Sequence, residues 1–158
     1  MKKYEFTDET KEVDGVVLHR IKAVRDFGSV KAGSLGGFIK KNSNLSHDGD
    51  AWVSGNAQVS DNAQVSGNAW VSGDARVSGD AQVEKINDIL TVGPVGSRND
   101  FTTFYKNKDG GISVICGCFC NNIDKFFERV QEKYGDLKHG KIYKKCIEIA
   151  KMQIIADE

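Results

Sequence analysis

Small and aliphatic residues alternate with turn-forming residues in a six-residue repeat that occupies the middle of the chain. The unit is Ala-x-Val-Ser-Gly/Asp-Asn/Asp, and it recurs from Ala51 to Val83. Alanine and valine lie two positions apart, so an extended backbone directs both to one side and the intervening residue to the other. The Ser-Gly-Asn segment favours a turn, because Gly, Asn and Asp tolerate positive φ. The pattern predicts short strands with an apolar inner face, separated by sharp turns.

Hexapeptide repeats of this kind resemble the left-handed parallel β-helix, in which three hexads complete one triangular turn. The resemblance implies that residues eighteen positions apart lie above one another, about 4.8 Å apart. The residues between alanine and valine then face outward in three stacked pairs: Trp52 with Trp70, Gln58 with Arg76, and Gln64 with Gln82. Continued backwards, the register predicts an irregular first turn over 33–50 and places His47 at a valine position.

The segment before the repeat is mixed and charged and predicts short strands, whereas the segment after it regains charge, aromatic residues and helical periodicity. These shifts divide the chain into an N-terminal β segment (1–32), a repeat region (33–83) and a C-terminal α+β cap (84–158). The expected fold class is therefore mainly β, with a short left-handed parallel β-helix between two smaller parts.

The flanking parts carry recognisable turn and helix signals. Asp14-Gly15 predicts a hairpin turn in the N-terminal segment, and Asp109-Gly110-Gly111 predicts another in the cap. The cap should contain three short strands followed by two helices. The first helix should be capped by Asn121 or Asn122 and end at Gly135, and the second should span about 141–155.

Composition narrows the choice of partners. Among 158 residues, Lys and Arg balance Asp and Glu, so the formal net charge is zero. We therefore expect no nucleic acid and no membrane as partner, and we interpret the basic cluster at 138–145 as a solvated helix face. The N-terminus lacks the apolar core of a secretory signal, which predicts a cytoplasmic location with reduced cysteines.

Three segments give the chain a family resemblance: AVRDFGSVKAGSLGGFI, NLSHDGDAWV and GSRNDFTTFYKNKDGGISVICGCF. With the variable hexads between them, they look like hexapeptide-repeat proteins of bacteriophages and prophages, a family without an assigned function. The resemblance covers almost the whole chain. It implies a phage origin and hence a location in the host cytoplasm.

The outward positions of the repeat are the candidate binding face. Trp52 and Trp70 fall on the same face, with Gln58 and Arg76 stacked on the next one. Two stacked tryptophans are explained by coverage from the same chain, for example by the C-terminal helices, or by a subunit interface. We expect self-association as a dimer or trimer.

His47 is the candidate catalytic residue. Hexapeptide-repeat acyltransferases use a histidine on the repeat as a general base and hold acyl-CoA between subunits, and Asp48 and Asp50 could orient such a base. The repeat lacks the protruding loop that those enzymes carry near the site. A γ-type carbonic anhydrase is excluded, because its zinc requires closely spaced histidines that this sequence lacks.

The cysteines offer a candidate metal site. Cys116, Cys118 and Cys120 alternate and would lie on one face of a strand, and Cys146 from the last helix could complete a set of four thiolates. The alternating spacing spreads the sulfur atoms along the strand, so buried core thiols are the preferred interpretation.

The sequence therefore favours a binding protein without catalytic activity or cofactor, whose partner is a host protein that it inhibits. Two alternatives stay open. One is a hexapeptide acyltransferase that uses acyl-CoA, and the other is a structural component of the virion or of its assembly.

Overall fold

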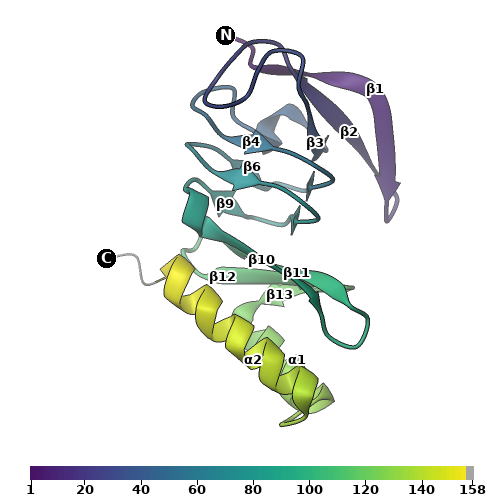
Figure 1. Ribbon diagram of the computed structural model, residues 1–158, viewed down its shortest axis with the longest axis vertical. Helices are drawn as coiled ribbons and strands as arrows, with labels where there is room; N and C mark the ends of the chain where they lie inside the picture. Colours follow the sequence, from purple (N-terminus) through teal and green to yellow (C-terminus); the bar gives the residue numbers. More distant parts are fainter. Residues whose placement is uncertain (156–158) are drawn as a thin grey trace. The chain divides into compact units, whose positions relative to one another are not determined.

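The structure, a computed structural model, describes residues 1–155 and divides into two compact units, Met1–Ile86 and Asn87–Glu158 (Figure 1). Each unit is described by itself. Within the described residues, no helix is long and apolar enough to cross a membrane.

The N-terminal unit begins with a long hairpin formed by β1 (Tyr4–Val13) and β2 (Val16–Ala23), which projects beyond the repeat strands (Figure 1). Its turn is the predicted one, with positive φ angles of 51° at Asp14 and 80° at Gly15. Strand β2 also pairs antiparallel with β3 (Leu35–Ile39). The hairpin therefore belongs to the same sheet as the start of the repeat region.

Each hexapeptide contributes a strand of two residues. These strands are β4 (Trp52–Val53), β5 (Gln58–Val59), β6 (Gln64–Val65), β7 (Trp70–Val71), β8 (Arg76–Val77) and β9 (Gln82–Val83). They pair in parallel at an offset of eighteen residues, β4 with β7, β5 with β8 and β6 with β9. The predicted register of the regular repeats is therefore confirmed.

The repeated alanines and valines form the interior of the N-terminal unit, and each is at most 1% exposed. Glycines at the turns have positive φ, for example 62° at Gly67. At the equivalent turn that contains Asp61 in place of glycine, φ is 54° and the carboxylate accepts a hydrogen bond from Gly79 N, 3.0 Å away. Asp61 thus takes over a glycine position because its side chain bonds to the turn eighteen residues later.

The expected fold class is nevertheless wrong. A left-handed parallel β-helix does not describe the strands of the N-terminal unit, which form three separate small sheets. The largest is a mixed sheet in the order β1-β2-β3-β5-β8, and β4-β7 and β6-β9 are isolated pairs. The physical reason is that two-residue strands end at every turn, while the antiparallel hairpin extends one of the three ladders. The broader expectation of a mainly β chain holds.

The backward extension of the register is also wrong. Leu45 bridges Val65 and Ile39 pairs with Val59, which are offsets of twenty residues rather than eighteen. Two additional residues are accommodated in the bend at 47–50, beside a 3-10 turn, η1 (Asn42–Asn44). Leu45 therefore takes the valine position that the eighteen-residue register assigned to His47.

The C-terminal unit is an antiparallel sheet with two helices on one face (Figure 1). It has four strands instead of the expected three: β10 (Ile89–Val95), β11 (Asp100–Lys106), β12 (Ile112–Cys116) and β13 (Phe119–Asn122). The unpredicted strand is β13, and it runs directly into α1 (Ile123–Lys133). A further 3-10 turn, η2 (Ile86–Asp88), precedes β10.

The two predicted helices are present. Asn122 caps α1, because its side chain accepts a hydrogen bond from Lys125 N at 2.9 Å, and Gly135 ends the segment with φ 54°. Helix α2 (Lys138–Ala150) starts three residues earlier than expected and continues as a π-helical turn, Lys151–Ile155.

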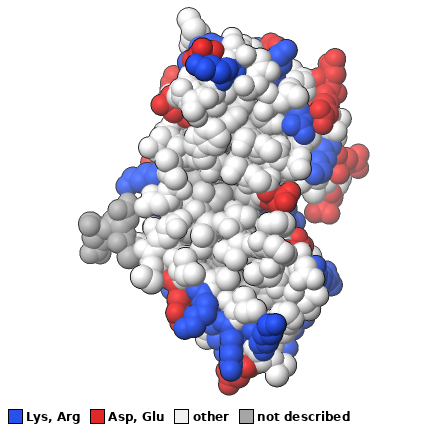
Figure 2. Space-filling view, in the orientation of Figure 1, with Lys and Arg blue, Asp and Glu red and all other residues white. Residues whose placement is uncertain are grey.

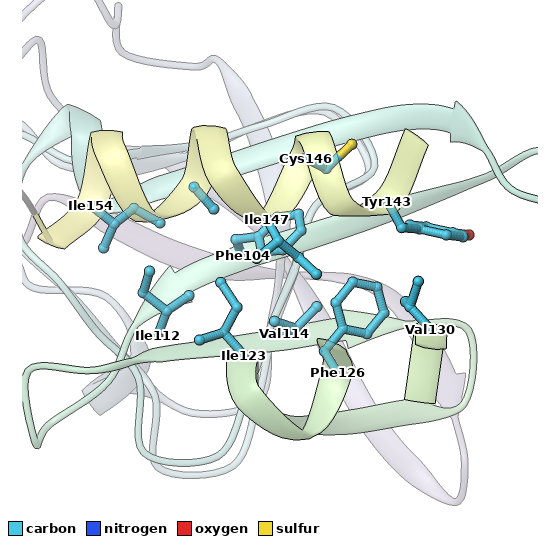
Figure 3. Packing of buried hydrophobic residues seen from close by; sticks show 11 residues of the cluster. Phe104, Ile112, Val114, Ile123, Phe126, Val130, Tyr143, Cys146, Ile147 and Ile154 are labelled. Atoms are coloured by element: carbon cyan, nitrogen blue, oxygen red, sulfur yellow. The ribbon is translucent and has the colours of Figure 1, made fainter. Parts of the chain in front are cut away.

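The core of the C-terminal unit lies between the sheet and the helices (Figure 3). Its central side chains come from β11, β12, α1 and α2, and include Phe104, Val114, Phe126 and Ile147. Tyr143 sits at one end of this cluster beside Val130, with its hydroxyl directed away from the aliphatic side chains (Figure 3).

Candidate functional site

The two tryptophans pair as expected, but they differ in exposure. Trp52 and Trp70 are register partners, yet Trp52 is only 2% exposed whereas Trp70 is half-buried. Phe27 packs edge-on against Trp52 with ring centroids 5.2 Å apart, and Gly36 also lies against the indole. Coverage of Trp52 thus comes from the N-terminal segment of its own unit, and this leaves Trp70 as the accessible member of the pair.

The hairpin of β1 and β2 also packs on the neighbouring face of the repeat region. Phe38, Gln58 and Arg76 lie side by side in β3, β5 and β8. The Arg20 guanidinium lies over the Phe38 ring at 4.5 Å, and its Nη1 donates to Gly36 O at 2.9 Å. Gln58 and Arg76 are half-buried, and they form the less covered part of this face.

His47 is fixed by its surroundings. Its Nδ1 accepts a hydrogen bond from Lys3 N at 3.0 Å, and its ring stacks on Tyr4 with centroids 4.1 Å apart. Arg25 donates to the His47 carbonyl at 3.1 Å. An imidazole that accepts at Nδ1 carries its proton on Nε2 in the neutral form, so no lone pair is directed toward a substrate. This geometry argues against a general base at His47.

The same cluster contains a buried ammonium group. Lys3 is fully buried, and its Nζ donates to Ala51 O at 2.7 Å and lies 4.7 Å from the Phe27 ring centroid. Burial, with the nearby Arg25 charge, lowers the pKa of Lys3 to about 8, while Asp50 and Asp48 oppose that shift. The side chains of Lys3, Tyr4 and His47 therefore anchor the chain start to residues 42–51.

We expect His47 to make the N-terminal unit less stable in acid. Burial, followed by the charge of Lys3, lowers the pKa of His47. The unfolded chain therefore binds a proton more readily than the folded chain just below pH 6.5, and stability is lost as the pH falls through the folded pKa. Denaturant unfolding at pH 7.5 and pH 5.0 measures this effect, with tryptophan fluorescence as the probe, because both tryptophans lie in this unit.

A histidine variant outside the cluster controls for the pH effect. His47→Gln should reduce the loss of stability between the two pH values, whereas His19→Gln, which lies on β2, should retain it. Equal pH dependence in the wild type and His47→Gln would show that the cluster does not sense protons.

The cysteines do not form the expected row. The chain turns at Gly117, where φ is 59°, so Cys116 ends β12, Cys118 lies in the turn and Cys120 lies on β13. Cys118 and Cys120 are exposed and Cys146 is buried. Within residues 1–155, no group of three or more His, Cys, Asp or Glu side chains could hold a metal ion. Burial raises the pKa of Cys146, which favours its protonated thiol.

A pocket of about 110 Å³ opens in the C-terminal unit among the β10–β11 loop, the β12–β13 turn and α1. Its floor consists of the buried side chains of Phe126, Val130 and Tyr143, and its walls include Phe119 and Tyr134. The rings contact one another, with centroids 5.4 Å apart for Phe119 and Phe126 and 5.5 Å apart for Phe126 and Tyr143. The pocket is therefore apolar and aromatic inside.

The rim of this pocket is cationic. Arg98, Arg129 and Lys133 line it, together with a single carboxylate, Asp100. The Arg129 guanidinium lies 5.7 Å from the Phe119 ring centroid, and Lys133 Nζ lies 5.3 Å from that of Tyr134. None of the three cations forms a salt bridge with another described residue. The positive charge at the mouth is thus available to a ligand.

Polar groups also lie at the floor of the pocket. Thr102 donates to Cys116 Sγ at 3.3 Å, and the Cys116 thiol donates to the Tyr143 hydroxyl at 3.7 Å. Burial, followed by the Cys116 thiol, raises the pKa of Tyr143, so its hydroxyl stays protonated at neutral pH. The hydroxyl therefore remains a hydrogen-bond donor, and rotation about its C–O bond decides whether its hydrogen faces the Cys116 thiol or the pocket.

Two further contacts shape the mouth. The Ser97 hydroxyl lies 3.0 Å from the Tyr134 hydroxyl, and this hydrogen bond, assisted by Lys133, lowers the pKa of Tyr134. A Cβ at position 96 would overlap the Tyr143 hydroxyl, and Gly96 has a φ of 79°, so this position requires glycine. No histidine is among the described residues that line the pocket.

Sequence reasoning missed this pocket, although the available signal lay in the segments that carry the family resemblance. The GSRND and CGCF segments are about twenty residues apart, and the hairpin of β11 and β12 brings their ends together. The chain matches no model of a known protein family, and no curated protein is similar enough to be a relative.

Proposed function

We propose that the protein is a non-enzymatic binding protein that engages a host protein in the host cytoplasm and thereby inhibits it. The observation that supports this function is the pocket of the C-terminal unit, whose interior is aromatic and whose rim carries three cations that form no salt bridge with another described residue. Such a site favours an anionic anchor from a partner, because cations at an apolar pocket form strong charge-assisted hydrogen bonds. Self-association as a dimer or trimer stays a prediction.

The surface around the pocket suits an acidic partner. On the face drawn in Figure 2, Lys and Arg side chains gather where α1 leads into α2. Part of this charge is neutralised, since Lys144 pairs with Asp136 at 3.3 Å and Lys145 with Glu148 at 3.7 Å. The cations that line the pocket form no such pair with a residue in the described part of the chain, and they are therefore the expected contacts.

Affinity capture tests the proposal. Wild-type protein and the double variant Arg98→Ala/Arg129→Ala are immobilised and incubated with a bacterial lysate. We expect a host protein that the wild type retains and the double variant loses by about 100-fold, because each charge-assisted hydrogen bond contributes roughly 1.5–3 kcal/mol.

The control is the double variant Lys138→Ala/Lys141→Ala, which removes two exposed cations from α2 that do not line the pocket. It should retain the same partner as the wild type. Identical bound proteins on all three matrices would contradict a role for the pocket, and turnover of an acyl-CoA by the wild type would instead favour the acyltransferase alternative.

A further inference from the structure

The pocket also specifies the chemistry of its ligand. We propose that it binds an aromatic carboxylate, presented as the C-terminal aromatic residue of the partner protein. This inference rests on the proposed function and assigns the group of the partner that enters the pocket.

The interior selects an aromatic ring. Its volume of about 110 Å³ is comparable with an engineered cavity of about 150 Å³ that binds benzene. Phe126 and Tyr143 already pack edge-to-face, with an interplanar angle of 86°, and Phe119 stands tilted at 50° to Phe126. A ligand ring would continue this arrangement, since offset and edge-to-face pairs contribute about 0.5–1.5 kcal/mol each beyond the area they bury.

The mouth selects a carboxylate. Two guanidinium groups and one ammonium group line it, and guanidinium groups match the two oxygens of a carboxylate in a bidentate geometry. The Arg129 and Lys133 cations already lie over the rings of Phe119 and Tyr134, respectively, so their side chains are partly ordered before binding. The Tyr143 hydroxyl also lines the pocket, and by rotating its hydrogen it can supply a further donor to the ligand.

The closed floor favours a chain end. Phe126, Val130 and Tyr143 are each at most 6% exposed and belong to the core, so the pocket has no exit on that side. A ring therefore enters through the mouth that the cations line, and the carboxylate has to lie close to that ring; the C-terminal aromatic residue of a protein carries both groups. Capture of terminal carboxylates is an established mode of peptide recognition.

Titration with small probes tests this inference on the full chain. N-acetyl-L-phenylalanine carries both the ring and the carboxylate, whereas its amide lacks the charge and N-acetyl-L-alanine lacks the ring. Binding is followed by chemical shifts of the pocket residues. We expect the acid to bind at least tenfold more tightly than either analogue. Equal binding of the acid and the amide, or no binding of the acid at millimolar concentration, would overturn the inference.

Variants assign the contacts. Arg98→Ala and Arg129→Ala should each weaken binding of the acid about tenfold, and Tyr143→Phe, which preserves the buried ring, should weaken it severalfold. Lys138→Ala should leave the affinity unchanged, because Lys138 does not line the pocket. If all four variants bind as tightly as the wild type, the acid binds elsewhere and the inference is wrong.

Two comparisons complete the test. The first distinguishes the C-terminus of a protein from a free aromatic acid as the source of the carboxylate. The second distinguishes a failure of the ligand assignment from a failure of the proposed function. 3-Phenylpropionate lacks the peptide group, so weaker binding than that of N-acetyl-L-phenylalanine supports a chain end. Equal or tighter binding assigns the pocket to free aromatic acids instead. If the acid fails to bind while host-protein capture still depends on Arg98 and Arg129, the ligand assignment falls and the proposed function stands.

Discussion

Replacing Gly67 by alanine is expected to destabilise the N-terminal unit by about 3 kcal/mol or more, a large part of the stability of a typical domain. Gly67 has a φ of 62°, and a Cβ there would overlap the carbonyl oxygen of Glu84 in the turn below. The left-handed conformation costs alanine about 1–2 kcal/mol, and the clash with backbone adds to it. That carbonyl accepts a hydrogen bond from Asn68 N at 3.1 Å, so it cannot move without losing a contact between successive turns.

Gly73 provides a matched control for this substitution. It has the same φ of 62°, but a Cβ there would meet no atom within 4 Å. Gly73→Ala should therefore lose only the conformational part, about 1–2 kcal/mol. Urea unfolding followed by tryptophan fluorescence measures both variants. Equal losses would show that the stacking of turns does not restrict position 67.

The second large effect is expected at Asn44, which is fully buried. Its Oδ1 accepts hydrogen bonds from Lys40 N at 3.1 Å and Lys41 N at 2.9 Å. Its Nδ2 donates to Ala63 O at 2.9 Å and also lies 3.3 Å from Asp61 O. Asn44→Ala removes the partners of Lys41 N and Ala63 O, while Lys40 N keeps its hydrogen bond to Val59 O at 3.1 Å. Each backbone group left unpaired in a buried position costs about 1–3 kcal/mol. We expect a loss of about 3 kcal/mol in the same unfolding assay.

Ser43→Ala is the control for Asn44, because Ser43 lies in the same 3-10 turn and is exposed. It should change stability by less than about 0.5 kcal/mol. A loss at Asn44 no larger than that at Ser43 would mean that water or a shifted backbone replaces the amide. Helical circular dichroism should stay constant in both variants, since α1 and α2 belong to the other unit.

The sequence allowed the regular part of the fold to be predicted because its contacts are periodic. Alternating Ala and Val define the interior, and the resemblance to a turn of three hexapeptides implied the eighteen-residue pairing of Trp52 with Trp70. The capping of α1 by Asn122 was also predictable, since a helix start depends on neighbouring residues.

The remaining features depend on contacts between residues far apart in the sequence. Nothing near Trp52 indicates that Phe27 covers it, and nothing in the bend at 47–50 shows that it absorbs two residues. The pocket of the C-terminal unit combines side chains from two loops and two helices, so no single motif contains it. The repeat pattern also does not specify the length of each strand, and the short strands are the reason why β4-β7 and β6-β9 form isolated pairs.

The buried amide of Asn44 has a consequence for folding. Nearly identical repeats allow a folding chain to align one hexapeptide too early or too late, with alanines and valines still buried. Such misaligned states differ little in hydrophobic free energy, so they compete with the native state as kinetic traps. The hydrogen bonds of Asn44 to Ala63 O and Asp61 O use backbone carbonyl groups, which neighbouring hexapeptides also offer. The buried amide therefore stabilises docking of the 3-10 turn on the repeat, but it does not by itself exclude a shift by one hexapeptide.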